Sequence, residues 1–223
     1  IDDIRYHLGL LAKNEIGYKN IIKLVSIANT EGMYYKPRID REILKEYSEG
    51  LICLSGCLAG ELARNIIEDY EKGKEVAKWY RDVFGDDYYL EIQANGIEEQ
   101  KIVNQKIVKL SKELNIPLVA TNDVHYTCRE DVEAQDILIC IQTGKKIDDE
   151  DRMKIDVDTL YIKSPEEIKK EFANFPEALE NTVKIAEKCN FEFEFGNTKL
   201  PNFDTPNGEK HEEYLKQKTY EGI

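Results

Sequence analysis

The spacing of hydrophobic residues divides the first fifty positions into three successive segments. In residues 5–14, apolar side chains recur at every second position, which predicts a strand with His7 on its opposite face. In residues 15–32 the apolar positions recur at helical spacing. A shorter helical pattern follows in residues 38–50, and Asp40 stands where an N-cap is expected. The segment therefore predicts a strand and two helices.

From residue 51 onward, short apolar runs alternate with longer amphipathic runs. The predicted strands cover residues 51–55, 88–93 and 116–123, and the predicted helices cover 57–85 (one or two helices), 96–115 and 129–144. Strands that alternate with helices of this length are typical of βαβ units in a parallel sheet. Because the strands are almost wholly apolar, we expect a sheet covered on both faces or closed into a barrel.

The last third of the chain is less regular. Residues 145–158 are charged and aperiodic, so we predict a loop, and residues 160–163 predict a short strand. Ser164 begins a capping box, which predicts a helix, and residues 175–190 predict another. Prolines and a glycine then indicate a linker to a final helical pattern. Because the chain opens without Met and stops within that pattern, we expect a piece of a longer protein.

Composition narrows the class of protein. The chain has 223 residues, 41% of them hydrophobic and 34% charged, which is typical of soluble globular domains. No apolar run approaches the roughly 18 residues of a membrane span. The net charge of −13 argues against a broad surface for nucleic acid on this segment. Five cysteines, without a CxxC pair, favour a reduced cytoplasmic compartment over a disulfide framework.

The stretch "VATNDVHY" (119–126) carries the clearest candidate chemistry. Asp123 and His125 follow an apolar strand, at the edge where parallel sheets place working residues. A carboxylate and an imidazole two residues apart could bind one divalent cation. On spacing alone we favour an Asx-turn beside a partly exposed histidine, because a lone D-x-H is a weak signal. The residues therefore leave both interpretations open.

Three other residues are candidates for the same site. His7 lies in the first predicted strand, and Cys57 directly follows the second one. Each also has an ordinary structural interpretation: His7 as a histidine within a sheet, and Cys57 as part of a tight turn. Glu91 is a carboxylate in an otherwise apolar strand, where it either faces the strand-end pocket or forms a salt bridge with a covering helix; we favour the salt bridge. Cys53, inside a strand, is expected in the core.

Several motifs together resemble one known family. The chain contains, in order, the stretches "YHLGLLAKNEIGYKN", "EGLICLSGCLAGE", "YLEIQANGIEEQ", "VATNDVHY" and "LYIKSPEEI". Together they resemble the amino-terminal PHP region of bacterial DNA polymerase III alpha subunits. The resemblance implies part of a distorted seven-stranded β/α barrel in residues 1–195. It implies a linker and the helical start of the polymerase palm in residues 196–223.

The resemblance also implies a site and its cofactor. His7, Cys57, Asp123 and His125 match positions of the family's metal ligands, which hold zinc or manganese. This chain contains no counterpart of three earlier ligand groups of the family: the H-x-H motif, the Asp-His pair that follows it and an early acidic ligand. They would lie before Ile1. The polymerase aspartates have no counterpart before Ile223. The metal cluster is therefore expected to be incomplete in this chain, and polymerisation, with its magnesium, is expected of a longer parent.

Three functions follow from these patterns. The first is a PHP segment of a replicative polymerase with metal-dependent 3′–5′ exonuclease chemistry. Its parent would bind DNA, deoxynucleoside triphosphates, a sliding clamp and a proofreading exonuclease, with little direct DNA binding by this acidic segment. The second is a stand-alone phosphoesterase of the same superfamily. The third is a non-catalytic module that docks a separate exonuclease.

Overall fold

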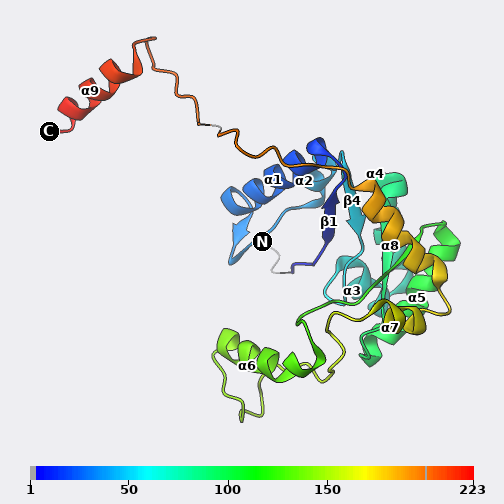
Figure 1. The fold of residues 1–223 in the computed structure, drawn as a ribbon. Coiled ribbons are helices and arrows are strands. Elements are labelled where there is room, and N and C mark those ends of the chain that lie inside the picture. The colour runs from blue at the N-terminus through cyan, green and yellow to red at the C-terminus, as the bar shows by residue number, and fades with distance from the viewer. Residues whose placement is uncertain (1–3, 199) are drawn as a thin grey trace. The chain divides into compact units, whose positions relative to one another are not determined.

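The structure, a computed structural model, describes residues 4–198 and 200–223 (Figure 1). The chain divides into two compact units, Ile1–Phe191 and Glu192–Ile223. The strands are β1 (Gly9–Ala12), β2 (Met33–Tyr34), β3 (Lys36–Pro37), β4 (Leu51–Leu54), β5 (Tyr88–Gln93) and β6 (Leu118–Thr121). The helices of the first unit are α1 (Glu15–Thr30), α2 (Arg41–Glu46), α3 (Glu61–Glu68), α4 (Tyr70–Phe84), α5 (Glu98–Leu114), α6 (Val132–Thr143), α7 (Pro165–Glu171) and α8 (Pro176–Lys188), with 3₁₀ turns at Gly85–Asp87 and Arg129–Asp131. The second unit contains α9 (His211–Glu221).

The central sheet of the first unit has the strand order β1-β4-β5-β6. β4, β5 and β6 are parallel, as predicted, because α3, α4 and α5 return the chain between them. β1 instead runs antiparallel to β4, with Gly9 opposite Leu54. The parallel arrangement predicted for the strands from residue 51 onward therefore does not extend to β1. β2 and β3 form a separate two-stranded ribbon, so the mixed α/β class is confirmed, while the seven-stranded barrel stays a prediction.

Both faces of the sheet are covered. The larger core lies against α3, α4 and α5, and its sheet residues include Cys53, Leu90 and Ile92. On the other face, the side chains of Ile52 and Val119 pack with Ile185 of α8. All six residues of β5 are buried. A central strand buried on both sides explains its nearly continuous apolar sequence. In Figure 1, α1 and α2 lie beside β1, and α4, α5 and α8 lie toward the opposite end of the sheet.

Local signals in the sequence position the helix ends. The Asp40 side chain accepts the Ile43 N–H at 2.9 Å and so caps α2. Ser164 and Glu167 form the predicted capping box at the start of α7. The predicted strand at 160–163 is instead a single bridge between Tyr161 and Tyr126. That segment is held through the Leu160 carbonyl, which accepts the His125 N–H at 2.8 Å, rather than by a strand ladder.

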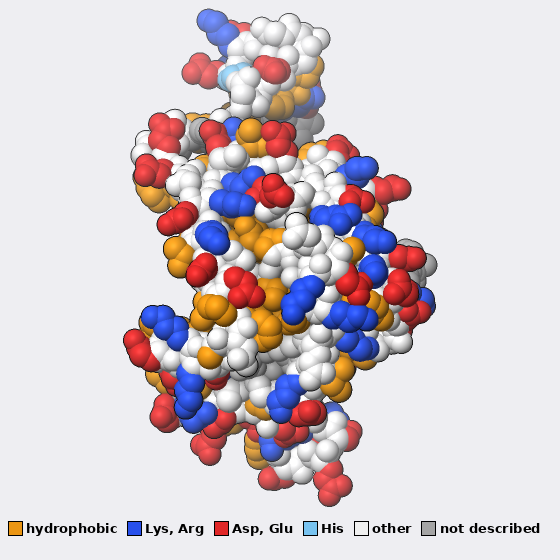
Figure 2. Space-filling model, turned by 90° about the vertical axis from the view of Figure 1, so that its right-hand side faces the viewer, with side chains coloured by type: hydrophobic (Ala, Val, Ile, Leu, Met, Phe, Trp, Pro, Cys, Tyr) orange, Lys and Arg blue, Asp and Glu red, His pale blue; other side chains and the backbone are white. Residues whose placement is uncertain are grey.

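One face of the molecule carries charged side chains of both signs (Figure 2). Figure 2 shows one face, on which basic and acidic side chains are interspersed and hydrophobic side chains are visible between them. This face has no broad basic area. In the part of the chain that the structure describes, no helix is long and apolar enough to cross a membrane.

Candidate metal centre

The turn after β4 wraps around the main chain of His7. The His7 N–H donates to the Ala59 carbonyl at 3.0 Å, and His7 forms a parallel bridge with Gly60. Gly56, at φ 83°, lies so close to this segment that a Cβ atom would meet the His7 carbonyl oxygen at 3.0 Å. A side chain at Gly56 would thus be both strained and crowded. The turn sequence "SGCLAG" therefore allows the end of β4 to pack closely against the main chain of His7.

This packing brings His7 and Cys57 together. The Cys57 Sγ atom lies 3.8 Å from Nδ1 of His7, and Cys57 is partly buried while His7 is exposed. Burial raises the pKa of the Cys57 thiol; the Ala59 amide opposes this shift, and the nearby Asp123 carboxylate adds to it. The metal-free thiol consequently keeps its proton at neutral pH, and a bound cation would have to displace it.

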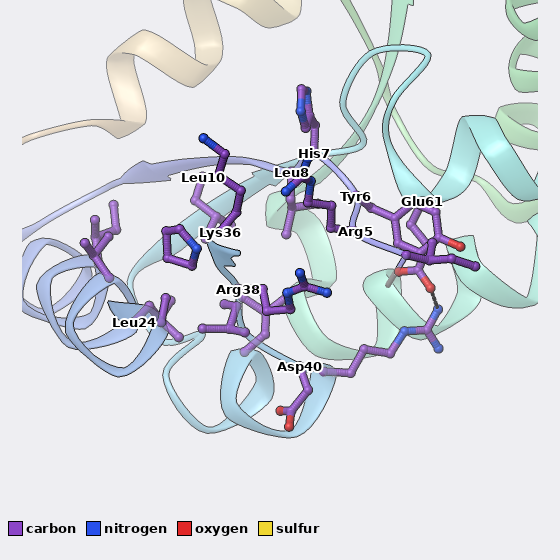
Figure 3. A pocket seen from close by; sticks show the side chains of 18 of the residues that line it. Arg5, Tyr6, His7, Leu8, Leu10, Leu24, Lys36, Arg38, Asp40 and Glu61 are labelled. Carbon is purple, nitrogen blue, oxygen red and sulfur yellow. Dashed lines mark hydrogen bonds and ion pairs between the residues drawn. The ribbon is translucent and has the colours of Figure 1, made fainter. Parts of the chain in front are cut away.

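His7 is one of the residues that line a pocket in the described part of the chain. That pocket, of about 790 Å³, is lined by β1, α1, α2 and the segments around them. Leu8 and Leu10 point into it, whereas the His7 ring points to the other side of the chain (Figure 3). The alternation predicted for residues 5–14 is thus correct: the His7 ring contacts Cys57, although His7 also belongs to the lining of the pocket.

Asp123 and His125 occupy a constrained turn at the end of β6. Asp123 has a left-handed backbone conformation, φ 50°, which is uncommon for a residue with a side chain. Nδ1 of His125 lies 2.6 Å from the Asp123 carbonyl oxygen. Because a carbonyl only accepts, Nδ1–H must be the donor, and in a neutral imidazole this leaves the lone pair of Nε2 for a ligand. This orientation is common for metal-binding histidines.

Glu91, on the central strand, is buried behind these turns. Its carboxylate accepts the Gly56 N–H at 2.5 Å and the Thr121 hydroxyl at 2.8 Å. Burial raises the pKa of Glu91, and these two hydrogen bonds oppose that shift. Within the described chain no lysine or arginine forms an ion pair with it, so the favoured salt-bridge interpretation was wrong. A charged residue in an apolar strand was the signal that could have identified this role.

The predicted site residues converge only partly. His7 and Cys57 are in contact, and Asp123 is close enough to influence the pKa values of both Cys57 and Glu91. His125 contacts the main chain of Asp123. No group of three or more His, Cys, Asp or Glu residues in the described chain is arranged around a single point that could hold a metal. Cys53 lies in the core, as expected.

The types of donor nevertheless suit a divalent cation. Imidazole nitrogen, thiolate sulfur and carboxylate oxygen are the ligands that zinc takes in proteins. His7 and Cys57 lie at the end of β4, and Asp123 and His125 follow β6, which β5 separates from β4. The residues present therefore fit part of a metal site at the carboxyl ends of the strands.

The first comparison with known proteins concerns the domain family. Residues 2–95 match the family model of the PHP domain, and this range contains both His7 and Cys57. PHP domains commonly bind metals, which agrees with the donor types found here.

The relatives narrow the class further. The chain is 52% identical to DNA polymerase III subunit alpha of Borreliella burgdorferi over 98% of its own length. It is 49% identical to the Campylobacter jejuni subunit over 89% of its length and 40% identical to that of Thermus aquaticus over 100%. These matches cover 19%, 18% and 19% of the three relatives, so the chain spans about a fifth of their length. The expected resemblance is confirmed: the chain matches a fragment of DNA polymerase III alpha subunits with a PHP domain.

Proposed function

We propose that this chain is the PHP segment of a replicative DNA polymerase and that its strand-end residues contribute to a metal site for phosphodiester hydrolysis. The contact of His7 with Cys57, with Asp123 nearby, carries the proposal. In this reading residues 1–195 belong to the PHP domain, and residues 196–223 form a linker and the start of the palm. The unpaired state of all five cysteines supports a cytoplasmic location.

The residues present would hold the metal from two sides of such a site. His7 and Cys57 would hold zinc or manganese from the β4 side, and Asp123 and Nε2 of His125 would hold it from the β6 side. A cation bound there supplies an activated water and stabilises charge on a phosphodiester. Glu91 would support these groups through the hydrogen bonds that it accepts from Gly56 and Thr121.

The proposal extends to the activity of the longer parent protein. By analogy with the relatives, the parent would polymerise deoxynucleoside triphosphates on DNA with magnesium, together with a sliding clamp and a proofreading exonuclease. The acidic charge of this segment argues that other parts of the parent supply most of the DNA contacts.

The test compares metal content and 3′–5′ exonuclease activity of the intact protein and of Asp123→Asn. We expect the substitution to lower both, because it removes the charge of a ligand while preserving its shape. Asp156→Asn is the matched control, because Asp156 is exposed in a loop and its nearest cation, Lys154, lies 3.7 Å away. Equal metal content and activity in Asp123→Asn and the unsubstituted protein would overturn the proposal.

A non-catalytic docking module is the second candidate. The lack of a three-residue ligand group in the described chain favours it. In this case chelation leaves the melting temperature of the protein unchanged, whereas loss of a bound metal lowers it through linkage.

A further inference from the structure

The Glu91 side chain joins the two turns that carry the candidate ligands. It is 7% exposed, and it projects from the central strand β5. One carboxylate oxygen accepts the Gly56 N–H, one residue before Cys57. The other oxygen accepts the hydroxyl of Thr121, two residues before Asp123. A single side chain thus connects the ends of β4 and β6.

Additional hydrogen bonds fix this connection at both ends. The Glu91 N–H donates to the Ser55 hydroxyl at 2.9 Å, so main chain and side chain of the same residue hold the β4 end. At the β6 end, the amide nitrogen of Gln93 lies 3.3 Å from the Thr121 hydroxyl oxygen. Because these groups are largely buried, each lost partner leaves a donor or an acceptor unsatisfied.

We propose that Glu91 is a positioning residue, which sets the separation of Cys57 and Asp123 through Gly56 and Thr121. The inference deepens the proposed metal site and rests on it for the identity of the ligands. The side chain makes both contacts as an acceptor, and it reaches both turns from the strand between them. Supporting residues of this kind commonly change metal affinity about 10- to 100-fold when they are replaced.

The hydrogen-bond geometry distinguishes positioning from direct ligation. Glutamine at position 91 can still accept the Gly56 N–H with its oxygen, and its amide can donate to the Thr121 hydroxyl, which also accepts. Leucine can do neither. A positioning role therefore tolerates Glu91→Gln and fails in Glu91→Leu, whereas a metal-ligand role fails in both.

The experiment uses Glu91→Gln, Glu91→Leu and Thr121→Val in the intact protein. The matched control is Asn181→Leu: Asn181 is 8% exposed and bonds the Leu118 carbonyl at the opposite end of β6. Two readouts need no metal: hydrogen exchange of the Gly56 amide, and alkylation of Cys57 by iodoacetamide, resolved by mass spectrometry. The exposed Cys128 is the internal reference for alkylation. The third readout is titration with Co²⁺, whose sulfur-to-cobalt absorption band reports thiolate ligation.

The expected result is a graded series. Glu91→Leu should accelerate Gly56 exchange and Cys57 alkylation severalfold and weaken Co²⁺ binding about 10- to 100-fold. Thr121→Val should have a smaller effect, and Glu91→Gln and Asn181→Leu should match the unsubstituted protein within about threefold. If Glu91→Leu does not fold, Thr121→Val decides the question, because it removes one hydroxyl and keeps the shape.

Two results would overturn the inference. The first is unchanged exchange and alkylation in both Glu91→Leu and Thr121→Val. The second is a loss in Glu91→Gln as large as in Glu91→Leu, because the carboxylate would then act by its charge or as a ligand. If the unsubstituted protein binds no Co²⁺, the proposed metal function fails, and the two metal-free readouts still decide the positioning role.

Discussion

The sulfur of Cys57 and the imidazole of His7 lie 3.8 Å apart although 50 positions separate them in the chain. The contact depends on the turn between β4 and α3, which accepts the His7 N–H through the Ala59 carbonyl. A soft sulfur donor beside an imidazole at a strand end is a pairing suited to zinc. It is the part of the candidate site that the structure defines most directly.

The first prediction concerns the pH dependence of metal binding. The pKa of Cys57 is raised above its usual value, mainly by burial. Below that pKa a proton competes with the cation for the sulfur, so affinity should fall as the pH falls, by about tenfold per unit for one displaced proton. Cys57→Ser should bind Zn²⁺ or Co²⁺ more weakly by at least the roughly tenfold that the loss of a supporting residue costs, because it removes a ligand itself.

Titration of the intact protein with Co²⁺ between pH 6 and 8 measures both effects. Cys57→Ser should also lose the sulfur-to-cobalt absorption band and part of the pH dependence. Cys128→Ser is the control, because Cys128 is exposed and has no assigned role in the site. An unaltered cobalt spectrum in Cys57→Ser would remove Cys57 from the ligand set.

The second prediction concerns stability in acid. The pKa of Glu167 is lowered to about 2, chiefly by the Tyr161 hydroxyl and then by the amide and hydroxyl of Ser164. A lowered folded-state pKa contributes stability above the unfolded value of 4.5, and this stability is lost as the pH falls toward 2. Glu167→Gln should therefore melt at a lower temperature than the unsubstituted protein at pH 7.

The difference between the two melting temperatures should shrink as the pH is lowered from 5 toward 2. Calorimetry over the acid range in which both proteins stay folded measures it. Glu166→Gln, at the neighbouring exposed position, is the matched control. A difference that stays constant with pH would show that the charge of Glu167 does not contribute.

The third prediction concerns the crossing of α3 and α4. A Cβ atom on Gly73 would lie 2.5 Å from Cβ of Ile66, within the buried contact between these helices. Alanine ordinarily favours a helix over glycine by about 1 kcal/mol. Overpacking of this kind costs about 1–3 kcal/mol, so Gly73→Ala should lower the free energy of unfolding. Glu75→Ala, on the exposed side of α4, should change it by about 0.5 kcal/mol or less. Urea denaturation separates the two results, and a stabilised Gly73→Ala would contradict the crossing geometry.

Sequence patterns were sufficient to predict those features of the fold that arise from interactions between residues close together in the chain. The N-cap at Asp40 and the capping box of Ser164 and Glu167 involve residues three positions apart, and both were predicted correctly. The buried strands β4, β5 and β6 were also predicted, because burial on both faces leaves a nearly continuous apolar run.

The same patterns could not predict features that depend on contacts between distant parts of the chain. Nothing within residues 5–14 indicates that β1 runs antiparallel to β4, because strand direction depends on how the chain returns through α1 and α2. The partners of Glu91 are 30 and 35 positions away, so spacing could not distinguish a hydrogen-bonded carboxylate from a salt bridge. The roles of His7, Cys57, Asp123 and His125 as ligands remain predictions from resemblance.

The fourth prediction concerns the buried cation that holds the segment after α6. The Lys163 side chain is 1% exposed, and its Nζ donates to the Ala94 carbonyl at 2.9 Å and to Glu171 at 2.6 Å. This anchor lies three residues after Leu160, whose carbonyl accepts the His125 N–H. Lys163→Met should lower the free energy of unfolding by about 1–3 kcal/mol, because it leaves two acceptors without their donor.

A double-mutant cycle with Glu171→Gln isolates the ion pair. Because the two residues are in contact, we expect a coupling energy of about 0.5–3 kcal/mol in urea denaturation. Lys169→Met, on the exposed surface of α7, should stay within about 0.5 kcal/mol of the unsubstituted protein. Since the anchor also holds the segment that binds the His125 main chain, hydrogen exchange of the His125 amide should accelerate in Lys163→Met and not in Lys169→Met. Equal exchange in the two variants would show that Lys163 stabilises α7 without supporting the candidate metal centre.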